Sequence, residues 1–169
     1  MKRLTSLILL FALASLALVS CKDEPDATWG WCELGMVLDE KFEKEDTGGA
    51  FDVAYSDGLA VVGFTRMSFE AAINDGIPET LSAYKFSEEY KKRTDLEDYV
   101  TLWLEDVPYI SYYTDEGIAE YFHIVAFYRS HHAYFAVVFV VNSTYQWDYR
   151  IKFNEFMLSA YLDYENQKG

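Results

Sequence analysis

Apolar residues along this chain are concentrated in the segment 118–161. At its centre lies the run 134–141, eight apolar residues rich in valine and aromatic side chains, which favour β-strands. A run of this length is too short to cross a bilayer and is typical of a strand covered on both faces. A second run, 121–128, precedes it across a short polar gap. Together the two runs predict an antiparallel hairpin.

After residue 141 the apolar spacing changes from that of a strand to that of an α-helix. Six apolar or aromatic side chains fall on one helical face, so the predicted helix can lie back on the two strands. Ser143 with Gln146 resembles a capping box at its start. The face comprises Tyr149, Phe153, Phe156, Met157, Ala160 and Tyr161.

Upstream, alternating and turn-forming residues predict more strands. The segment 29–38 alternates mostly with a period of two, which is typical of a strand. Asp57-Gly58 lies between the segments 51–55 and 59–64, and a glycine at such a turn tolerates positive φ. The pattern therefore predicts a second hairpin.

Helices and two further strands are expected between the hairpins. Ser68 is placed to cap a short helix through Asn74. A longer helix is expected over 79–93, followed by strands over 99–104 and 107–113, the second with a proline that favours an edge or a strand start. The order of elements indicates an α+β fold, an antiparallel β-sheet flanked by helices.

The same core and turn positions resemble the PsbP-like family, which includes the photosystem II extrinsic protein and many small bacterial lipoproteins. The resemblance covers about residues 33–163 and implies an α/β/α sandwich. It carries over no catalytic, ligand or cofactor residues. The matching positions are Lys41-Phe42, 59–64 with Ser68-Phe69-Glu70-Ala71-Ala72, Gly76-Ile77, 106–112, 121–128, Ala133-Tyr134-Phe135 and Phe153-Asn154-Glu155-Phe156.

The first twenty residues have the pattern of a bacterial signal peptide. Lys2 and Arg3 precede the apolar segment 7–19, which is too short for a membrane span. The sequence then reads Leu-Val-Ser-Cys, which resembles the lipobox of bacterial lipoproteins. The resemblance implies cleavage before Cys21 and lipidation of its thiol and new amino group, including palmitate. An ordinary secretory signal that happens to contain a cysteine is the alternative.

These features divide the chain into a signal peptide over 1–20, a tether over 21–28 and a single α+β domain over 29–169. Two or three acyl chains hold a protein stably on a membrane, whereas one does not. Lys22 follows the cysteine, which resembles outer-membrane lipoproteins, and the Lys-Asp-Glu sequence resembles a surface-export signal. We expect the protein in the cell membrane or the outer membrane, facing the periplasm or the exterior.

Charge excludes one class of partner. The chain has 14 basic and 28 acidic residues, a net charge of −14, and loss of the signal peptide would remove two bases and no acids. Nucleic acid is excluded as a partner, because phosphates need Lys and Arg opposite them. Anionic headgroups would also repel the protein body, so the acyl chains must supply the membrane attachment.

The two cysteines restrict how the fold is held together. With Cys21 lipidated, Cys32 has no partner within the chain, so no disulfide framework forms and the core must stabilise the domain. Cys32 is expected to be a buried small hydrophobe, because no basic residue lies near it in sequence to activate the thiol.

Few residues suggest catalysis. His131-His132 is the only metal-ligand pair, and an exposed hairpin turn explains it better, because adjacent strand residues point to opposite faces. His123 is interpreted as a packed or edge residue with a local hydrogen bond. The sequence has no nucleophile elbow, phosphate loop or zinc motif, so no metal or cofactor is expected. Five acids form either a solvated face or a hidden carboxylate site: Asp95, Glu97, Asp98, Glu105 and Asp106.

The tyrosines are the most suggestive surface feature, although half of them could simply support a helix. They are Tyr109, Tyr112, Tyr113, Tyr121, Tyr128 and Tyr145. The sequence thus favours a lipid-anchored, non-catalytic envelope protein that binds or scaffolds another envelope component. A small-ligand binder with a cleft between helix and sheet is one alternative. A hydrolase that uses acids and a histidine is the other.

Overall fold

The structure is a computed structural model that describes residues 26–27 and 33–162. The predicted signal peptide, the lipidation site Cys21 and Cys32 lie outside the described residues. Within the predicted tether, Asp26–Ala27 form strand β1, which pairs with β2. No helix in the described ranges is both long and apolar enough to span a membrane.

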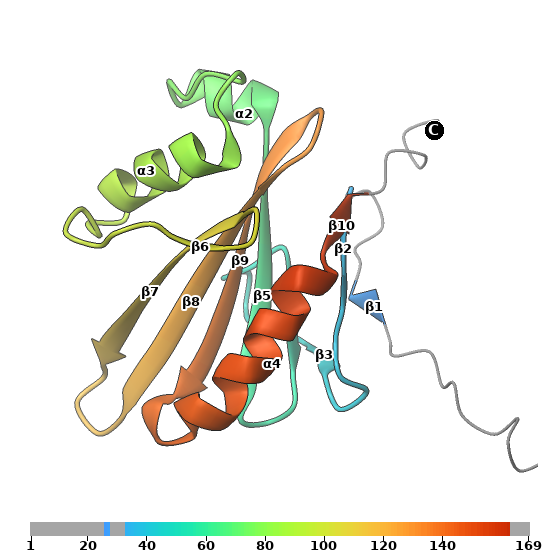
Figure 1. Cartoon of the computed structure of the whole chain (residues 1–169), viewed down its shortest axis with the longest axis vertical. Helices are drawn as coiled ribbons and strands as arrows, with labels where there is room; N and C mark the ends of the chain where they lie inside the picture. Colours follow the sequence, from blue (N-terminus) through green and yellow to red (C-terminus); the bar gives the residue numbers. More distant parts are fainter. Residues whose placement is uncertain (1–25, 28–32, 163–169) are drawn as a thin grey trace, which may run out of the picture.

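The described elements follow one another in the order shown by the colours of Figure 1. They are β1 (Asp26–Ala27), β2 (Leu34–Val37), β3 (Glu43–Glu45), β4 (Val53–Ser56), β5 (Ala60–Ser68), α2 (Phe69–Asn74), α3 (Ala83–Arg93), β6 (Leu102–Leu104), β7 (Val107–Asp115), β8 (Glu120–Arg129), β9 (Ala133–Asn142), the 3-10 turn η1 (Ser143–Tyr145), α4 (Gln146–Ser159) and β10 (Tyr161–Leu162).

A seven-stranded sheet forms the centre of the domain. Its order is β3-β4-β5-β9-β8-β7-β6, and every neighbouring pair is antiparallel. Strands β1, β2 and β10 form a separate small sheet. The α+β fold class is confirmed, and so is the hairpin of β8 and β9. The other predicted hairpin, β4 with β5, turns through Gly58 at φ 86°.

Strand β9 contributes to two separate cores. Phe135, Val137 and Phe139 belong to a core on the α4 side of the sheet. Tyr134 and the residues that alternate with these belong to a second core on the α3 side. Because successive strand residues point to opposite faces, a continuous apolar run fills both cores at once. The prediction of a strand covered on both faces is confirmed.

Helix α4 covers one face of the sheet and is fixed to it by a buried hydroxyl. Tyr149, Phe153 and Phe156 fill the core there, and β2 packs along the other side of the helix. The Tyr128 hydroxyl of β8 donates to the Met157 carbonyl oxygen at 3.0 Å. Four of the six predicted residues, Tyr149, Phe153, Phe156 and Met157, form the buried face of this helix, whereas the helix ends at Ser159, so Ala160 caps it and Tyr161 is an exposed residue of β10.

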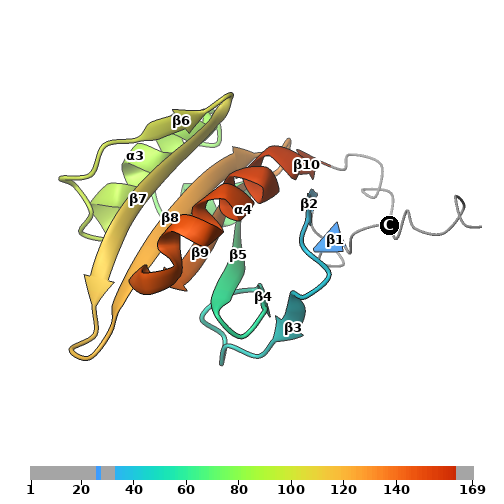
Figure 2. The same cartoon turned by 60° about the horizontal axis from the view of Figure 1, so that its bottom comes forward.

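The opposite face is covered by α2 and α3. Phe86 of α3 stacks on Tyr134 with ring centroids 4.4 Å apart. The Tyr134 hydroxyl donates to the Pro78 carbonyl at 2.7 Å and accepts from the Leu81 backbone N–H at 3.0 Å. The hydroxyl of this buried side chain thus provides hydrogen-bond partners for two backbone groups in the connection between α2 and α3. Figure 2 shows α3 and α4 on opposite faces of the sheet, which makes an α/β/α sandwich.

Helix starts were predicted less well than strands. Ser68 caps α2 as expected, its hydroxyl accepting from the Ala71 N–H. The longer helix begins at Ala83 rather than at residue 79, because the residues before it bond to Tyr134 and Ser82 supplies the cap. The capping box at Ser143 was wrong. Asn142 accepts from the Thr144 N–H instead, and a 3-10 turn precedes α4.

Candidate interaction surface

His123 is packed into the α3 face of the sheet. Its Nε2 lies 2.8 Å from the Thr114 hydroxyl, and its ring stacks on Tyr112 with centroids 4.7 Å apart. Burial lowers the pKa of His123, because the charged imidazolium loses solvent there. The interpretation of His123 as a packed residue with a local hydrogen bond is confirmed.

The other two histidines lie far along the same hairpin. His131 and His132 are exposed in the turn between β8 and β9, as predicted, and the His132 carbonyl accepts from the Phe69 N–H at 2.9 Å. Six further residues of strand β8, about 20 Å at roughly 3.3 Å per residue, lie between His123 and the turn that carries His131. No group of three or more His, Cys, Asp or Glu residues in the described part of the chain could hold a metal ion.

The six suggestive tyrosines do not form one surface. Tyr128 is buried beneath α4, whereas Tyr113 and Tyr145 are exposed. Tyr112 lies on the α3 side between Tyr99 and His123. Burial, followed by the neighbouring tyrosines, raises the pKa of Tyr112 to about 12, so it is protonated at neutral pH. The structure thus divides this set between the two faces of the sheet.

In contrast, the five acids gather at the two ends of edge strand β6. Asp95, Glu97 and Asp98 lie in the loop before it, and Glu105 and Asp106 form the two-residue turn after it. All five are exposed, and none forms an ion pair within the described residues. These acids are solvated residues before and after one strand, and they do not form a paired-carboxylate site.

Between those acids lies an exposed apolar segment, residues 99–104. Trp103 points to the α3 side and stacks on Tyr84 with centroids 5.4 Å apart, whereas Leu104 joins the partly buried border of the α4-side core. We call the segment 99–104 the β6 edge. Its exposed side chains are Tyr99 (37%), Val100 (72%), Leu102 (42%) and Trp103 (54%).

Polar bonds to α3 fix the start of the β6 edge. Thr101 is buried, with its hydroxyl 3.0 Å from the Ser87 hydroxyl and 2.7 Å from Glu88 Oε1. Lys91 Nζ lies 2.7 Å from the same carboxylate and donates to the Tyr99 carbonyl at 2.9 Å. The exposed side chains are therefore presented on a backbone that is held in place.

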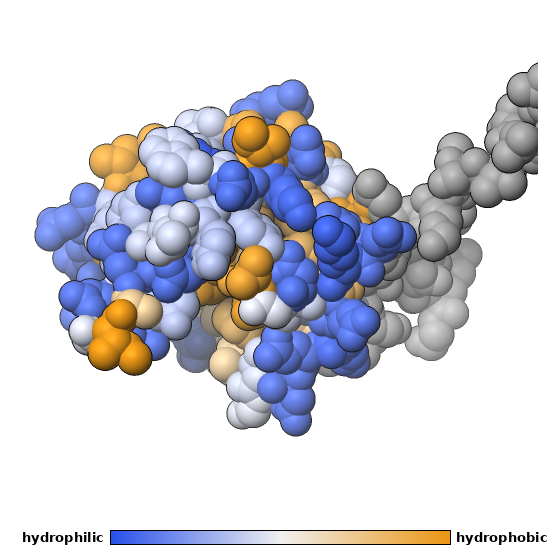
Figure 3. Space-filling model, turned by 90° about the horizontal axis from the view of Figure 1, so that it is seen from below, coloured by the Kyte–Doolittle hydropathy of each residue, from blue (hydrophilic) through white to orange (hydrophobic). Residues whose placement is uncertain are grey.

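Elsewhere, exposed apolar side chains are mostly scattered, apart from Trp147 (69%), Ile151 (65%) and Leu158 (45%) on the outward face of α4. Seen from below in Figure 3, the surface is largely hydrophilic, with apolar side chains in small separate patches. Ile118 at the β7–β8 turn and Leu59 at the β4–β5 turn are examples. Single exposed apolar residues are normal on soluble domains, whereas Leu102 and Trp103 on an edge strand, with Tyr99 and Val100 just before it, form a group that is informative.

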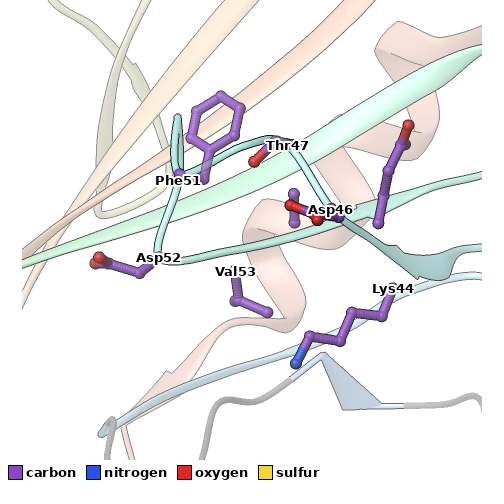
Figure 4. A pocket seen from close by; sticks show the side chains of 9 residues that line it. Lys44, Asp46, Thr47, Phe51, Asp52 and Val53 are labelled. Atoms are coloured by element: carbon purple, nitrogen blue, oxygen red, sulfur yellow. The ribbon is translucent and has the colours of Figure 1, made fainter.

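Hollows among the described residues are small or open. A hollow of about 480 Å³ lies beside β3 and is lined by residues 44–47, 49 and 51–54. Figure 4 shows Lys44, Asp46 and Val53 among the side chains that line it. Ligand pockets are typically concave and mainly apolar, whereas the walls here combine buried Val53 and Ala54 of β4 with exposed residues of β3 and the loop after it, several of them charged.

No protein-family model and no curated protein matches this sequence. Solved structures are similar in fold. A Bacteroides thetaiotaomicron protein matches 81% of this chain with a TM-score of 0.54 and 8% identity. The match spans only 47% of the length of that protein. The cyanobacterial PsbP protein of Synechocystis also matches, with a TM-score of 0.39 and 11% identity over 86% of this chain and 99% of its own. The likeness to the Bacteroides thetaiotaomicron protein concerns the fold alone.

Proposed function

We propose that the protein is a lipid-anchored, non-catalytic module of a bacterial cell envelope that binds another envelope protein. The observation that carries this proposal is the β6 edge, where four neighbouring apolar side chains stay exposed on a backbone fixed to α3. Aromatic residues at such positions supply most of the binding energy in protein interfaces. Both faces of the sheet are filled by core side chains, which leaves its edges to meet a partner.

The membrane attachment rests on the sequence alone. Cys21 follows the pattern of a lipobox, and acyl chains would hold an acidic protein body on a membrane that repels it. Palmitate labelling of the wild type against Cys21→Ala tests the anchor, with label expected only in the wild type. Equal labelling of the two proteins, or a mature N-terminus downstream of Cys21 by mass spectrometry, would refute it.

Site-specific photo-crosslinking tests the interaction role. A benzoyl-phenylalanine at position 103 should crosslink to an envelope protein in intact cells that produce the full chain. The matched control is the same residue at position 147, where α4 carries a tryptophan that is more exposed (69%) than Trp103 (54%). Equal crosslinking from both positions, or none from position 103, would contradict an interaction through the β6 edge.

Among the described residues, the small-ligand alternative has the hollow beside β3 and a smaller one of about 140 Å³ between α4 and β2, lined by Val37, Asp39, Lys152, Glu155, Phe156 and Ser159. Both hollows have charged residues in their walls, which favour a polar ligand rather than the apolar ligands that deep pockets bind. The hydrolase alternative needs an acid beside a histidine. Replacing His123, His131 and His132 together would abolish an activity of that kind while the fold is retained, and an unchanged activity would exclude a histidine mechanism.

A further inference from the structure

We propose that the β6 edge binds an extended, basic peptide segment of a partner protein, which adds an eighth strand to the seven-stranded sheet. This inference rests on the proposed interaction role and names the class of partner. It follows from the outward backbone groups of β6, the apolar side chains beside them and the acids at both ends of the strand. Strand addition of this kind takes affinity from the backbone and specificity from the side chains.

Backbone pairing shows which groups face outward. In the β6–β7 ladder, Trp103 lies opposite Pro108, with Leu102 and Leu104 opposite Tyr109 and Val107. Proline has no N–H, so the Trp103–Pro108 pair is the one without hydrogen bonds. The N–H and C=O groups of Trp103 consequently point away from β7, toward the open edge. β6 is the last strand of the sheet among the described residues, so these groups are available to another strand.

Side chains on both faces would pack against an added strand. Trp103 projects to the α3 side and Leu102 to the α4 side, because they alternate along the strand. Both are about half exposed, so a bound strand would bury apolar surface on each face of the sheet. Cross-strand aromatic and β-branched neighbours contribute to pairing, so a peptide with valine, threonine or phenylalanine at its centre fits this edge.

The acids around the β6 edge favour basic residues at the two ends of a bound peptide. Asp98 and its neighbours border one end of the β6 edge, and Glu105 with Asp106 borders the other. Of the four bases of α3, Lys91 is paired to Glu88 and Lys92 to Glu89, whereas Arg93 donates to the Asp75 carbonyl and Lys85 lies over the Tyr84 ring. A peptide with Lys or Arg at both ends therefore meets opposite charge at each end, which favours its approach and its register.

A second copy of this chain fits the same edge poorly. Antiparallel pairing of two β6 strands about Trp103 would bring Asp98 of one copy to the same end as Glu105 and Asp106 of the other. Like charges that face each other across an interface oppose association. The net charge of −14 on each chain adds to this repulsion.

Peptide binding to the full chain in detergent micelles tests the proposal. The probe is a fluorescent, end-capped peptide, Lys-Lys-Val-Thr-Phe-Thr-Val-Lys-Lys, and the comparison peptide has Glu in place of every Lys. We expect the basic peptide to bind about tenfold or more tightly than the acidic one, with the difference falling at high salt. Trp103→Lys should weaken binding by about tenfold, whereas the matched variant Trp147→Lys on α4 should not.

A probe with N-methyl groups on the phenylalanine and both valine nitrogens, the alternate set that faces β6 when the phenylalanine lies opposite Trp103, avoids any question of variant folding, because it removes donors from the peptide only. It should bind at least about tenfold more weakly than the unmodified peptide if a strand is added. Equal binding of the acidic and basic peptides, no effect of Trp103→Lys, or undiminished binding of the methylated peptide would each overturn the proposal. So would a dimer that Trp103→Lys dissociates in sedimentation, since the occupant would then be a second copy.

This experiment and the tests of the proposed function fail independently. Peptide binding does not require the lipid anchor, so an unlabelled Cys21 leaves the result intact. If the peptide does not bind but position 103 still crosslinks to a protein in cells, the interaction role stands and only the strand-addition mode is lost.

Discussion

The two edges of the seven-stranded sheet have the same length and opposite chemistry. Strand β3 has the sequence Glu-Lys-Glu, and all three side chains are exposed. Strand β6 has the sequence Leu-Trp-Leu, with two side chains exposed and one half-buried. Charged side chains along an edge strand discourage pairing with another strand, and β3 follows that rule. β6 carries its acids only beyond its two ends.

The position of the charges decides what each edge can do. Charges on the strand itself oppose any added strand, because they would have to be desolvated against it. Charges beyond the ends stay in water and act on the ends of a bound peptide, so they select among partners rather than exclude them all. We therefore expect the two edges to be stabilised by different local contacts, so that a substitution can disturb one edge and leave the other unchanged.

The largest expected change in the free energy of unfolding is on the β3 side of the sheet. A Cβ at Gly63 of β5 would lie 2.5 Å from the Phe51 ring, which packs over this glycine and holds the loop beside β3. Gly63→Ala should therefore lower the free energy of unfolding by about 1–3 kcal/mol in urea titrations. In the Phe51→Ala background the same change should cost much less, because the ring is gone. Additive effects in this double-mutant cycle would contradict the assignment.

A smaller loss is expected at the β6 edge. Thr101→Val removes a buried hydroxyl that contacts Ser87 and Glu88, and should lower the free energy of unfolding by about 1–2 kcal/mol. The matched control is Thr65→Val, at an exposed position of β5, which should change it by less than about 0.5 kcal/mol. Equal losses for the two variants would show that the Thr101 bonds do not fix this edge.

Local patterns predicted the centre of the sheet but not its edges. β9 and the Gly58 turn were foreseen, because a long apolar run and a glycine of positive φ are signals within a few residues. β3 was not foreseen, because its three residues are all polar and only pairing with β4 makes them a strand. The polarity of these three residues does not indicate that they pair with β4.

The candidate site shows the same limit. The acids and the strand of residues 99–104 were both recognised in the sequence, but as separate features. Their relation depends on strand order, since β5 pairs with β9 across 65 to 81 residues and thereby leaves β6 at the end of the sheet. Long-range pairing of this kind is set by tertiary packing, so periodicity could not place the acids around an open edge.

The smallest expected effect is a pH dependence at the β6 edge. The Lys91 ammonium, and then the Thr101 hydroxyl, hold the pKa of Glu88 below its usual value of 4.5. A lowered folded-state pKa gives stability that is present above the unfolded pKa and lost as pH falls through the folded one. Glu88→Gln should thus lower the free energy of unfolding by under about 1 kcal/mol at pH 7, because the pair is partly solvated. The difference between the two proteins should shrink below pH 4.5 in urea titrations, and it should be smaller at every pH in a Lys91→Met background. A difference that grows as the pH falls would show that Glu88 is stabilised in its protonated form, and Lys91 would then have no part in fixing the edge.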